Sequence, residues 1–149
     1  MSVVEKSIEV NVPVRTAYNQ WTQFEDFPKF MDGVQEVTQL DDKHLKWKAN
    51  VGGKDEEWHA EITEQVPDRR IAWTSRGGAM NAGAVTFHRL SDDKSKVMVQ
   101  LEYEPQGFLE HVGDAAGLVS RRVEGDLERF KQFIESRGRE TGAWRGTIS

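Results

Sequence analysis

Residues 107–137 read GFLEHVGDAAGLVSRRVEGDLERFKQFIESR, and this stretch decides the fold. Its apolar residues recur at alternating spacings of three and four, which predicts one amphipathic helix over the whole stretch. The residues of this apolar stripe are Val112, Ala116, Val119, Val123, Leu127, Phe130 and Ile134. Charged side chains such as Glu124 and Lys131 fall on the opposite side, so the stripe needs an apolar surface supplied by earlier parts of the chain.

The two halves of the stripe differ in the size of their side chains. The second half, residues 123–134, carries large residues and is expected to dock firmly. The first half contains Gly113 and Gly117, and each glycine inside a helix costs about 1 kcal/mol relative to alanine. This small-sided half either covers a cavity or lets the helix backbone approach the sheet closely, and the sequence supports both interpretations.

Composition favours one packed domain. The chain has 149 residues, of which 37% are hydrophobic, with five Trp and seven Phe. We expect a single domain over residues 1–137, followed by a glycine-punctuated tail, 138–149, that looks detachable. A net charge of -5 argues against nucleic acid as a partner, because phosphate-backbone binding needs a concentrated basic face.

Cysteine content and hydropathy indicate in which cellular compartment the protein is expected. The chain has no cysteine, which excludes disulfides, a thiol nucleophile and thiolate metal ligands. No apolar run approaches the roughly 20 residues of a membrane span, and the first ten residues, MSVVEKSIEV, lack the apolar core of a signal peptide. We therefore expect a soluble cytoplasmic protein with no integral membrane segment.

The residues before the long helix predict mainly strands. A first strand over 3–10 is followed by a helix that begins near Pro13 and by one short turn around Phe27 and Phe30. Alternating apolar and polar residues then predict six strands: 34–40, 44–51, one ending at Val66, 69–76, one carrying Val85 and Phe87, and one over 97–103. The short turns between them imply an antiparallel meander. The expected fold is α+β: a curved antiparallel sheet of about seven strands wrapped around the long C-terminal helix, a helix-grip arrangement, with two short helices after the first strand.

Several stretches, in this order and spacing, carry a resemblance to a known family. They are residues 10–21 (VNVPVRTAYNQW), 27–31 (FPKFM), 64–73 (EQVPDRRIAW), 83–87 (GAVTF), 103–105 (YEP), and the ending from 126 to 146. The chain resembles the START-related superfamily, which includes birch-pollen-allergen-like proteins, and within it the polyketide cyclase/dehydrase and lipid-transport family. The resemblance implies a hydrophobic cavity between the sheet and the C-terminal helix. Members bind lipids, sterols, quinones or polyketides, and only some are catalysts.

The first functional hypothesis is a non-catalytic protein that binds or carries a small hydrophobic molecule. The expected wall and lid of its site are Trp47, Trp58, Trp73, Phe87, Leu101, Tyr103, Val112, Ala116 and Val119. Aromatic rings also bury a large area wherever they lie, so the same residues are equally compatible with a filled core. No cofactor is expected.

The second hypothesis is a cyclase or dehydratase that acts on a polyketide-like substrate, with Tyr103, His111 or Arg76 as its polar group. No catalytic residue is predicted, because three of the four histidines fall on the solvent face of their strands: His44, His59 and His88. The histidines lack a ligand spacing such as His-x-x-x-His, so no metal site is expected. Asp126 lies only about 40° from the centre of the stripe, yet Arg122 four residues earlier offers it a simple partner.

The third hypothesis is a protein-interaction module that uses the exposed sheet face around Lys46, Lys48, His59 and Glu61. The sequence does not predict an oligomeric state. For any bound molecule, the polar groups at or near inward strand ends are Asn50, Ser75, Arg76, Asn81 and Tyr103.

Overall fold

The computed structural model describes residues 2–51, 53–76, 80–104 and 115–149 of the chain. Its elements are β1 (Ser2–Val10), α1 (Val14–Trp21), the 3₁₀ helix η1 (Phe24–Lys29), β2 (Val34–Gln39), β3 (His44–Val51), β4 (Lys54–Val66), β5 (Arg70–Arg76), β6 (Met80–Ser91), β7 (Lys94–Tyr103) and α3 (Ala115–Arg137). Every strand predicted from the alternation of apolar and polar residues is present. The first part of the predicted long helix, residues 107–114, lies outside the described residues.

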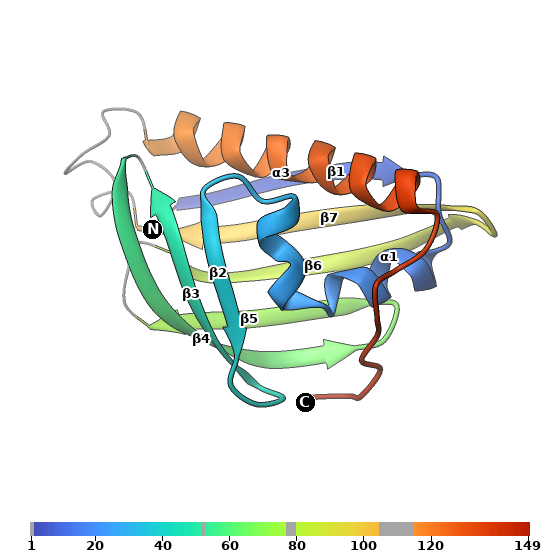
Figure 1. Ribbon diagram of the computed structural model, residues 1–149, viewed down its shortest axis with the longest axis horizontal. Helices are drawn as coiled ribbons and strands as arrows, with labels where there is room; N and C mark the ends of the chain where they lie inside the picture. Colours follow the sequence, from blue (N-terminus) through green and yellow to red (C-terminus); the bar gives the residue numbers. More distant parts are fainter. Residues whose placement is uncertain (1, 52, 77–79, 105–114) are drawn as a thin grey trace.

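The strands form one antiparallel sheet in the order β1-β7-β6-β5-β4-β3-β2. Neighbours in sequence from β2 to β7 are neighbours in the sheet, as in a meander, and β1 completes the order by pairing with β7. Figure 1 shows the sheet strongly curled, with α3 running alongside β1 and β7 and with α1 and η1 on the same concave side. This is the predicted α+β helix-grip fold.

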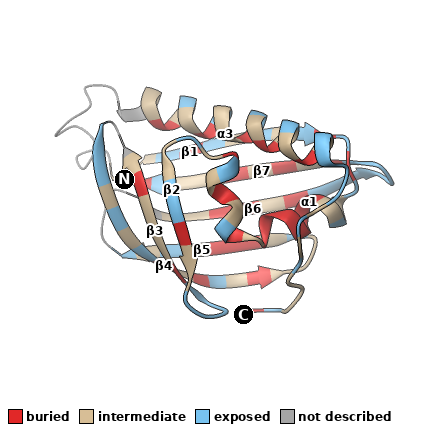
Figure 2. Cartoon of the chain, in the orientation of Figure 1, coloured by how far each residue is buried: buried red, intermediate tan, exposed pale blue. Residues whose placement is uncertain are grey.

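Helix α3 buries one stripe and exposes the other side, as the spacing of its apolar residues predicts (Figure 2). From residue 117 onward its buried residues are Val119, Val123, Leu127, Phe130 and Ile134, whereas Arg121, Glu124 and Glu128 are exposed. Within the described ranges, no helix combines the length and the apolar character that crossing a membrane requires.

Aromatic rings join α1, η1 and α3 into one cluster. The Trp21 ring lies 4.9 Å from the Phe130 ring and 5.5 Å from the Phe27 ring, measured between centroids. Phe30, just after η1, lies 5.2 Å from Phe130. The short turn predicted around Phe27 and Phe30 is therefore confirmed, and it packs directly against the large-residue half of α3.

Strand β4 carries an irregularity that the sequence did not indicate. Its register with β5 shifts between Ile62 and Glu64, as in a β-bulge, so the inward alternation moves by one residue. Gln65 is consequently buried, and its side-chain Nε2 donates a hydrogen bond to the Tyr18 hydroxyl at 3.1 Å. A polar residue thus ties β4 to α1 in the interior.

Residues 138–149 pack against the body of the protein, so the expectation of a detachable tail is wrong. Arg145 donates hydrogen bonds to Asn19 Oδ1 (2.6 Å) and Asp68 Oδ2 (2.8 Å), and its guanidinium lies 5.5 Å from the centre of the Tyr18 ring. Ile148 is buried and forms an antiparallel bridge with Gln65, with N–H to C=O distances of 2.8 and 2.9 Å. The tail therefore holds α1 against the end of β4.

The glycines of the tail explain why it looked like a linker. Gly138 has a φ of 75° and its N–H bonds to the carbonyl of Ile134, so it ends α3 and turns the chain back. Gly142 lies so close to the connection between α1 and η1 that an added Cβ would be 2.7 Å from Gln23 Oε1. Here glycine serves helix termination and close packing rather than flexibility.

Deletion of residues 139–149 should lower the free energy of unfolding by about 2–5 kcal/mol, because it removes the buried Ile148 side chain and the Arg145 bonds. Denaturant unfolding followed by circular dichroism measures this loss. A chain shortened only by the exposed Ser149 serves as the control. Equal unfolding midpoints for the two shortened chains would contradict the docking of the tail.

Candidate functional site

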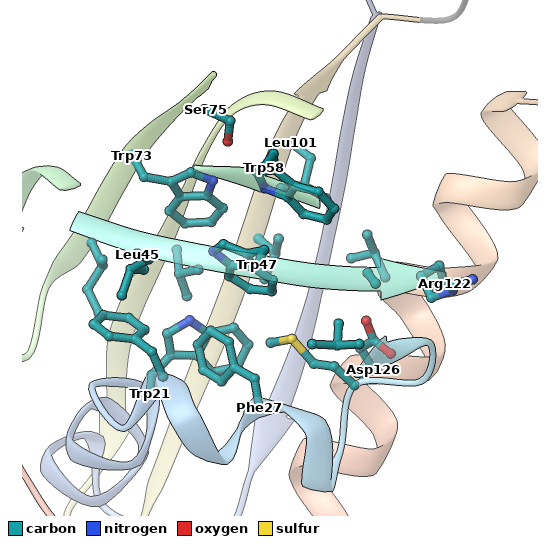
Figure 3. A pocket seen from close by; sticks show the side chains of 18 of the residues that line it. Trp21, Phe27, Leu45, Trp47, Trp58, Trp73, Ser75, Leu101, Arg122 and Asp126 are labelled. Atoms are coloured by element: carbon teal, nitrogen blue, oxygen red, sulfur yellow. The ribbon is translucent and has the colours of Figure 1, made fainter. Parts of the chain in front are cut away.

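A cavity of about 140 Å³ lies between the concave face of the sheet and the helices (Figure 3). Of the 20 described residues that line it, 17 are apolar. They come from every layer of the fold: Trp21, Phe24, Phe27, Met31, Val34, Leu45, Trp47, Ala49, Trp58, Ile62, Ile71, Trp73, Val85, Val99, Leu101, Val123 and Leu127. The remaining three lining residues are Ser75, Arg122 and Asp126.

Four of the five tryptophans of the chain line the cavity. Trp47 on β3 and Trp58 on β4 are directly paired in register, and their rings stack with centroids 5.8 Å apart and planes 8° from parallel. Trp73 pairs with Gly83 on β6, where an added Cβ would lie 2.5 Å from the Trp73 ring. Glycine at this position therefore lets the indole lie against the sheet. The result is a wall of flat aromatic faces.

The polar atoms of α3 meet the loop before β2 at the edge of the cavity. The Asp126 carboxylate oxygen Oδ1 accepts hydrogen bonds from the Asp32 backbone N–H (3.0 Å) and from Arg129 Nη2 (2.6 Å). Arg122 Nη1 donates to the backbone carbonyls of Asp32 (3.0 Å) and Asn50 (3.2 Å). Side chains of α3 therefore hold both the N–H and the C=O of Asp32.

Gly33 makes this arrangement possible. It has a φ of 81°, and an added Cβ would overlap Arg122 Nη1 and lie 2.9 Å from the Asn50 carbonyl oxygen. Any other residue at this position would strain the backbone and displace the Arg122 guanidinium. Glycine at position 33 is therefore required if the Arg122 guanidinium is to occupy this position.

The charge on Asp126 is unfavourable where it lies. Burial raises the pKa of the Asp126 carboxyl to about 6, although hydrogen bonds from Arg129 and the Asp32 N–H, and the charges of Arg129 and Arg122, act in the opposite direction. The loss of hydration therefore outweighs the favourable contacts. A raised pKa in a cavity wall is common at functional sites.

Ser75 on β5 supplies the third polar group. Its hydroxyl oxygen is buried and has no hydrogen-bond partner among the described residues, and in Figure 3 it points toward the cavity. Such a group costs free energy unless water or a ligand satisfies it. In the sheet, Ser75 pairs with Ala60 on β4, and Ala60 pairs with Leu45 on β3. Leu45 is five residues from Asn50 on the same strand. This places Ser75 roughly 17 Å along the strands from the Arg122 contact.

The structure separates the nine residues predicted for the site. Trp47, Trp58, Trp73 and Leu101 line the cavity. Phe87, Tyr103 and Val119 are buried but do not line it. Val112 and the side chain of Ala116 lie outside the described residues.

The position of Phe87 has a clear physical reason. The Phe87 ring lies 5.2 Å from Tyr18 and 6.4 Å from Trp21, so it belongs to the packed contact between β6 and α1. Tyr103, at the end of β7, pairs with Ser2 of β1 and Met80 of β6. Both residues are buried, as the alternation predicts, and the Phe87 ring packs against α1 instead of lining the cavity.

The other candidate polar residues lie away from the cavity or outside the described residues. His44, His59 and His88 are exposed, as their strand positions predict, and so is Arg76. His111 and the side chain of Asn81 lie outside the described residues. Within the part of the chain that the structure describes, no three His, Asp or Glu side chains are grouped as metal ligands.

The prediction from the sequence did not include Arg122 and Asp126, which form the polar end of the cavity. It assigned Arg122 to Asp126 as a helical pair, but Asp126 bonds to Arg129 and Arg122 reaches two backbone carbonyls. That pairing is therefore wrong. The signal that could have identified Asp126 was its position close to the apolar stripe, where an ionised carboxylate is unusual.

Comparison with known proteins identifies related sequences. The model of the family described as polyketide cyclase / dehydrase and lipid transport matches residues 10–132. An uncharacterized 17.2 kDa protein of Streptomyces lincolnensis is 59% identical over 149 residues, which is 99% of each chain.

Solved structures share the fold. A Deinococcus radiodurans protein is 27% identical, with a TM-score of 0.69 over 92% of this chain and 99% of its own. The Zhui aromatase/cyclase of Streptomyces sp. R1128 is 16% identical, with a TM-score of 0.77 over 96% of this chain and 99% of its own. A START superfamily protein of Mycobacterium smegmatis is 14% identical, with a TM-score of 0.68 over 91% of this chain and 95% of its own.

The raised pKa of Asp126 predicts a pH-dependent stability. Between about pH 4 and pH 6 the folded state keeps the Asp126 proton while the unfolded state has lost it, so the free energy of unfolding falls as pH rises. The total decrease in the free energy of unfolding reaches about 3 kcal/mol above pH 6. Asp126→Asn should therefore be more stable than wild type at pH 7, by up to this amount, and the gain should vanish near pH 4.

Guanidinium chloride unfolding of both proteins from pH 4 to 7.5 measures this difference. Glu128→Gln makes the same change at an exposed position of α3 and is expected to follow wild type. If the free energies of unfolding of Asp126→Asn and wild type differ by the same amount at every pH, the pKa of the Asp126 carboxyl is not raised.

Proposed function

The chain belongs to the polyketide cyclase/dehydrase and lipid transport family, and on this basis we propose that it binds a small hydrophobic molecule in the cavity between the sheet and α3. The observation that carries the proposal is the cavity wall, in which 17 of the 20 described residues are apolar and four are tryptophans. A ligand placed there gains about 25 cal/mol for each Å² of apolar surface that it removes from water, before the costs of association are subtracted.

The volume of the cavity indicates the size of the ligand. Engineered protein cavities of roughly 150 Å³ with apolar walls stay dry and bind benzene. The cavity here is about 140 Å³, so a molecule with one ring fits it without rearrangement. A larger ligand requires side chains of the wall to move.

Two alternatives follow from the sequence, and each lacks an observation that favours it. A cyclase or dehydratase needs a positioned acid or base, and Asp126 is the one carboxyl among the described lining residues. Its hydrogen bonds are structural, because they hold Asp32 and Arg129. An interaction module needs no cavity. We therefore retain ligand binding as the proposed function.

Indole N–H signals in a ¹H–¹⁵N correlation spectrum provide a direct test with toluene as the probe. Addition of toluene should shift the signals of Trp21, Trp47, Trp58 and Trp73, whose rings line the cavity. Trp144 does not line it and is an internal control. Equal small shifts at all five indoles, or none, would contradict the proposal. Native mass spectrometry of freshly purified protein would identify a ligand carried from the cell.

Filling the cavity should separate stability from binding. Ala49 is buried in the cavity wall, and Ala49→Leu should occupy part of the space, raise the free energy of unfolding by about 1 kcal/mol and weaken toluene binding by at least about tenfold. Ala72→Leu makes the same change on β5, where the side chain does not line the cavity, and should leave binding unchanged. Calorimetric titration measures both. Unchanged binding in Ala49→Leu would remove the cavity as the binding site.

A further inference from the structure

The polar end of the cavity has hydrogen-bonding atoms that the protein does not use. Asp126 Oδ1 accepts two bonds, but Oδ2 has no partner among the described residues and is not fully buried. Arg122 uses Nη1 for two carbonyls, whereas its Nε and Nη2 have no partner among the described residues. Both side chains line the cavity, and Figure 3 shows them together on α3 at one end of it.

These free atoms are fixed in position. Asp126 is held by the Asp32 N–H and Arg129, and Arg129 Nε in turn donates to the Phe30 carbonyl at 3.0 Å. Arg122 is held by two backbone carbonyls next to Gly33. A ligand therefore meets an acceptor and several donors that need little reorganisation, which lowers the cost of binding.

We propose that Arg122 and Asp126 select a neutral ligand that carries an alcohol or phenol hydroxyl at one end of an apolar, ring-sized body. This inference rests on the proposed function and adds the chemical class of the ligand. The hydroxyl donates its hydrogen to Asp126 Oδ2 and accepts a hydrogen bond from Arg122. The rest of the molecule lies against the tryptophan wall.

Charge and hydrogen bonding distinguish this class from others. A hydroxyl both donates and accepts, so it satisfies Asp126 and Arg122 at once. A carboxylate pairs with Arg122 but offers no hydrogen to Asp126 and places two negative charges side by side in a partly buried site. A protonated amine donates to Asp126 but repels Arg122. A hydrocarbon leaves both groups to water.

A pair of ligands with the same shape tests the role of the hydroxyl. p-Cresol and p-xylene differ by one hydroxyl in place of one methyl, and 4-methylbenzoate supplies the carboxylate. We expect wild type to bind p-cresol about tenfold more tightly than p-xylene, a factor that corresponds to about 1.4 kcal/mol. 4-Methylbenzoate should bind more weakly than p-cresol. Indole chemical shifts measure all three dissociation constants.

The ratio of the p-xylene to the p-cresol dissociation constant is then measured in variants. Because the ratio is taken within one protein, general effects of a substitution on the cavity cancel. Asp126→Leu and Arg122→Met should each bring the ratio close to one. Glu128→Leu places the same side chain as the first variant on the exposed side of α3 and should keep the wild-type ratio.

Each outcome has a defined meaning. Equal binding of p-cresol and p-xylene by wild type would overturn the inference and leave the proposed function standing. Tightest binding of 4-methylbenzoate, or a ratio that both variants preserve, would also overturn it. Failure of all three probes to bind would overturn the proposed function and the inference together. Arg122→Met provides the test if Asp126→Leu does not fold.

Discussion

The contact of Phe130 with Trp21 and Phe30 is the interaction on which the rest of the structure depends. The three rings come from α3, α1 and the end of η1, with centroids of Trp21 and Phe30 lying 4.9 and 5.2 Å from that of Phe130. They fix one half of the long helix against the two short ones. A curled sheet of seven strands presents a wider concave face than this cluster fills. The cavity lies between the aromatic cluster and the strands that carry the other tryptophans.

Hydrogen bonds at a second place keep that cavity from closing. Asp126 and Arg122 hold the backbone of Asp32 on both sides, and Arg122 also reaches the end of β3 through Asn50. Hydrogen bonds thus attach helix α3 to the edge of the sheet. Collapse of the helix onto Trp47 and Trp58 would break these bonds and bury charged groups without partners. The ring contacts of Phe130 and the hydrogen bonds of Asp126 and Arg122 together keep the cavity open.

Much of this architecture could be predicted from the sequence. Strand alternation correctly placed Trp47, Trp58 and Trp73 on the inner face, because side chains in a strand alternate strictly between two faces. Alternation cannot tell which part of an inner face stays uncovered, so Phe87 faces inward yet contacts Tyr18 instead of the cavity. That distinction depends on the position of α1, which is set by contacts distant in sequence. The docking of the tail through Arg145 and Ile148 depends on distant contacts in the same way.

The charge on Asp126 is the feature that packing alone does not explain. Its structural task is to accept hydrogen bonds from the Asp32 N–H and from Arg129, and the amide oxygen of an asparagine accepts the same bonds. An asparagine at this position carries no charge to desolvate, whereas burial raises the pKa of the Asp126 carboxyl to about 6. A group that makes the fold less stable than a close substitute is expected where binding or chemistry uses it. Asp126 lines a largely apolar cavity next to Arg122, and its Oδ2 has no partner among the described residues. Recognition of a ligand hydroxyl therefore accounts for both the charge and the position of this carboxylate.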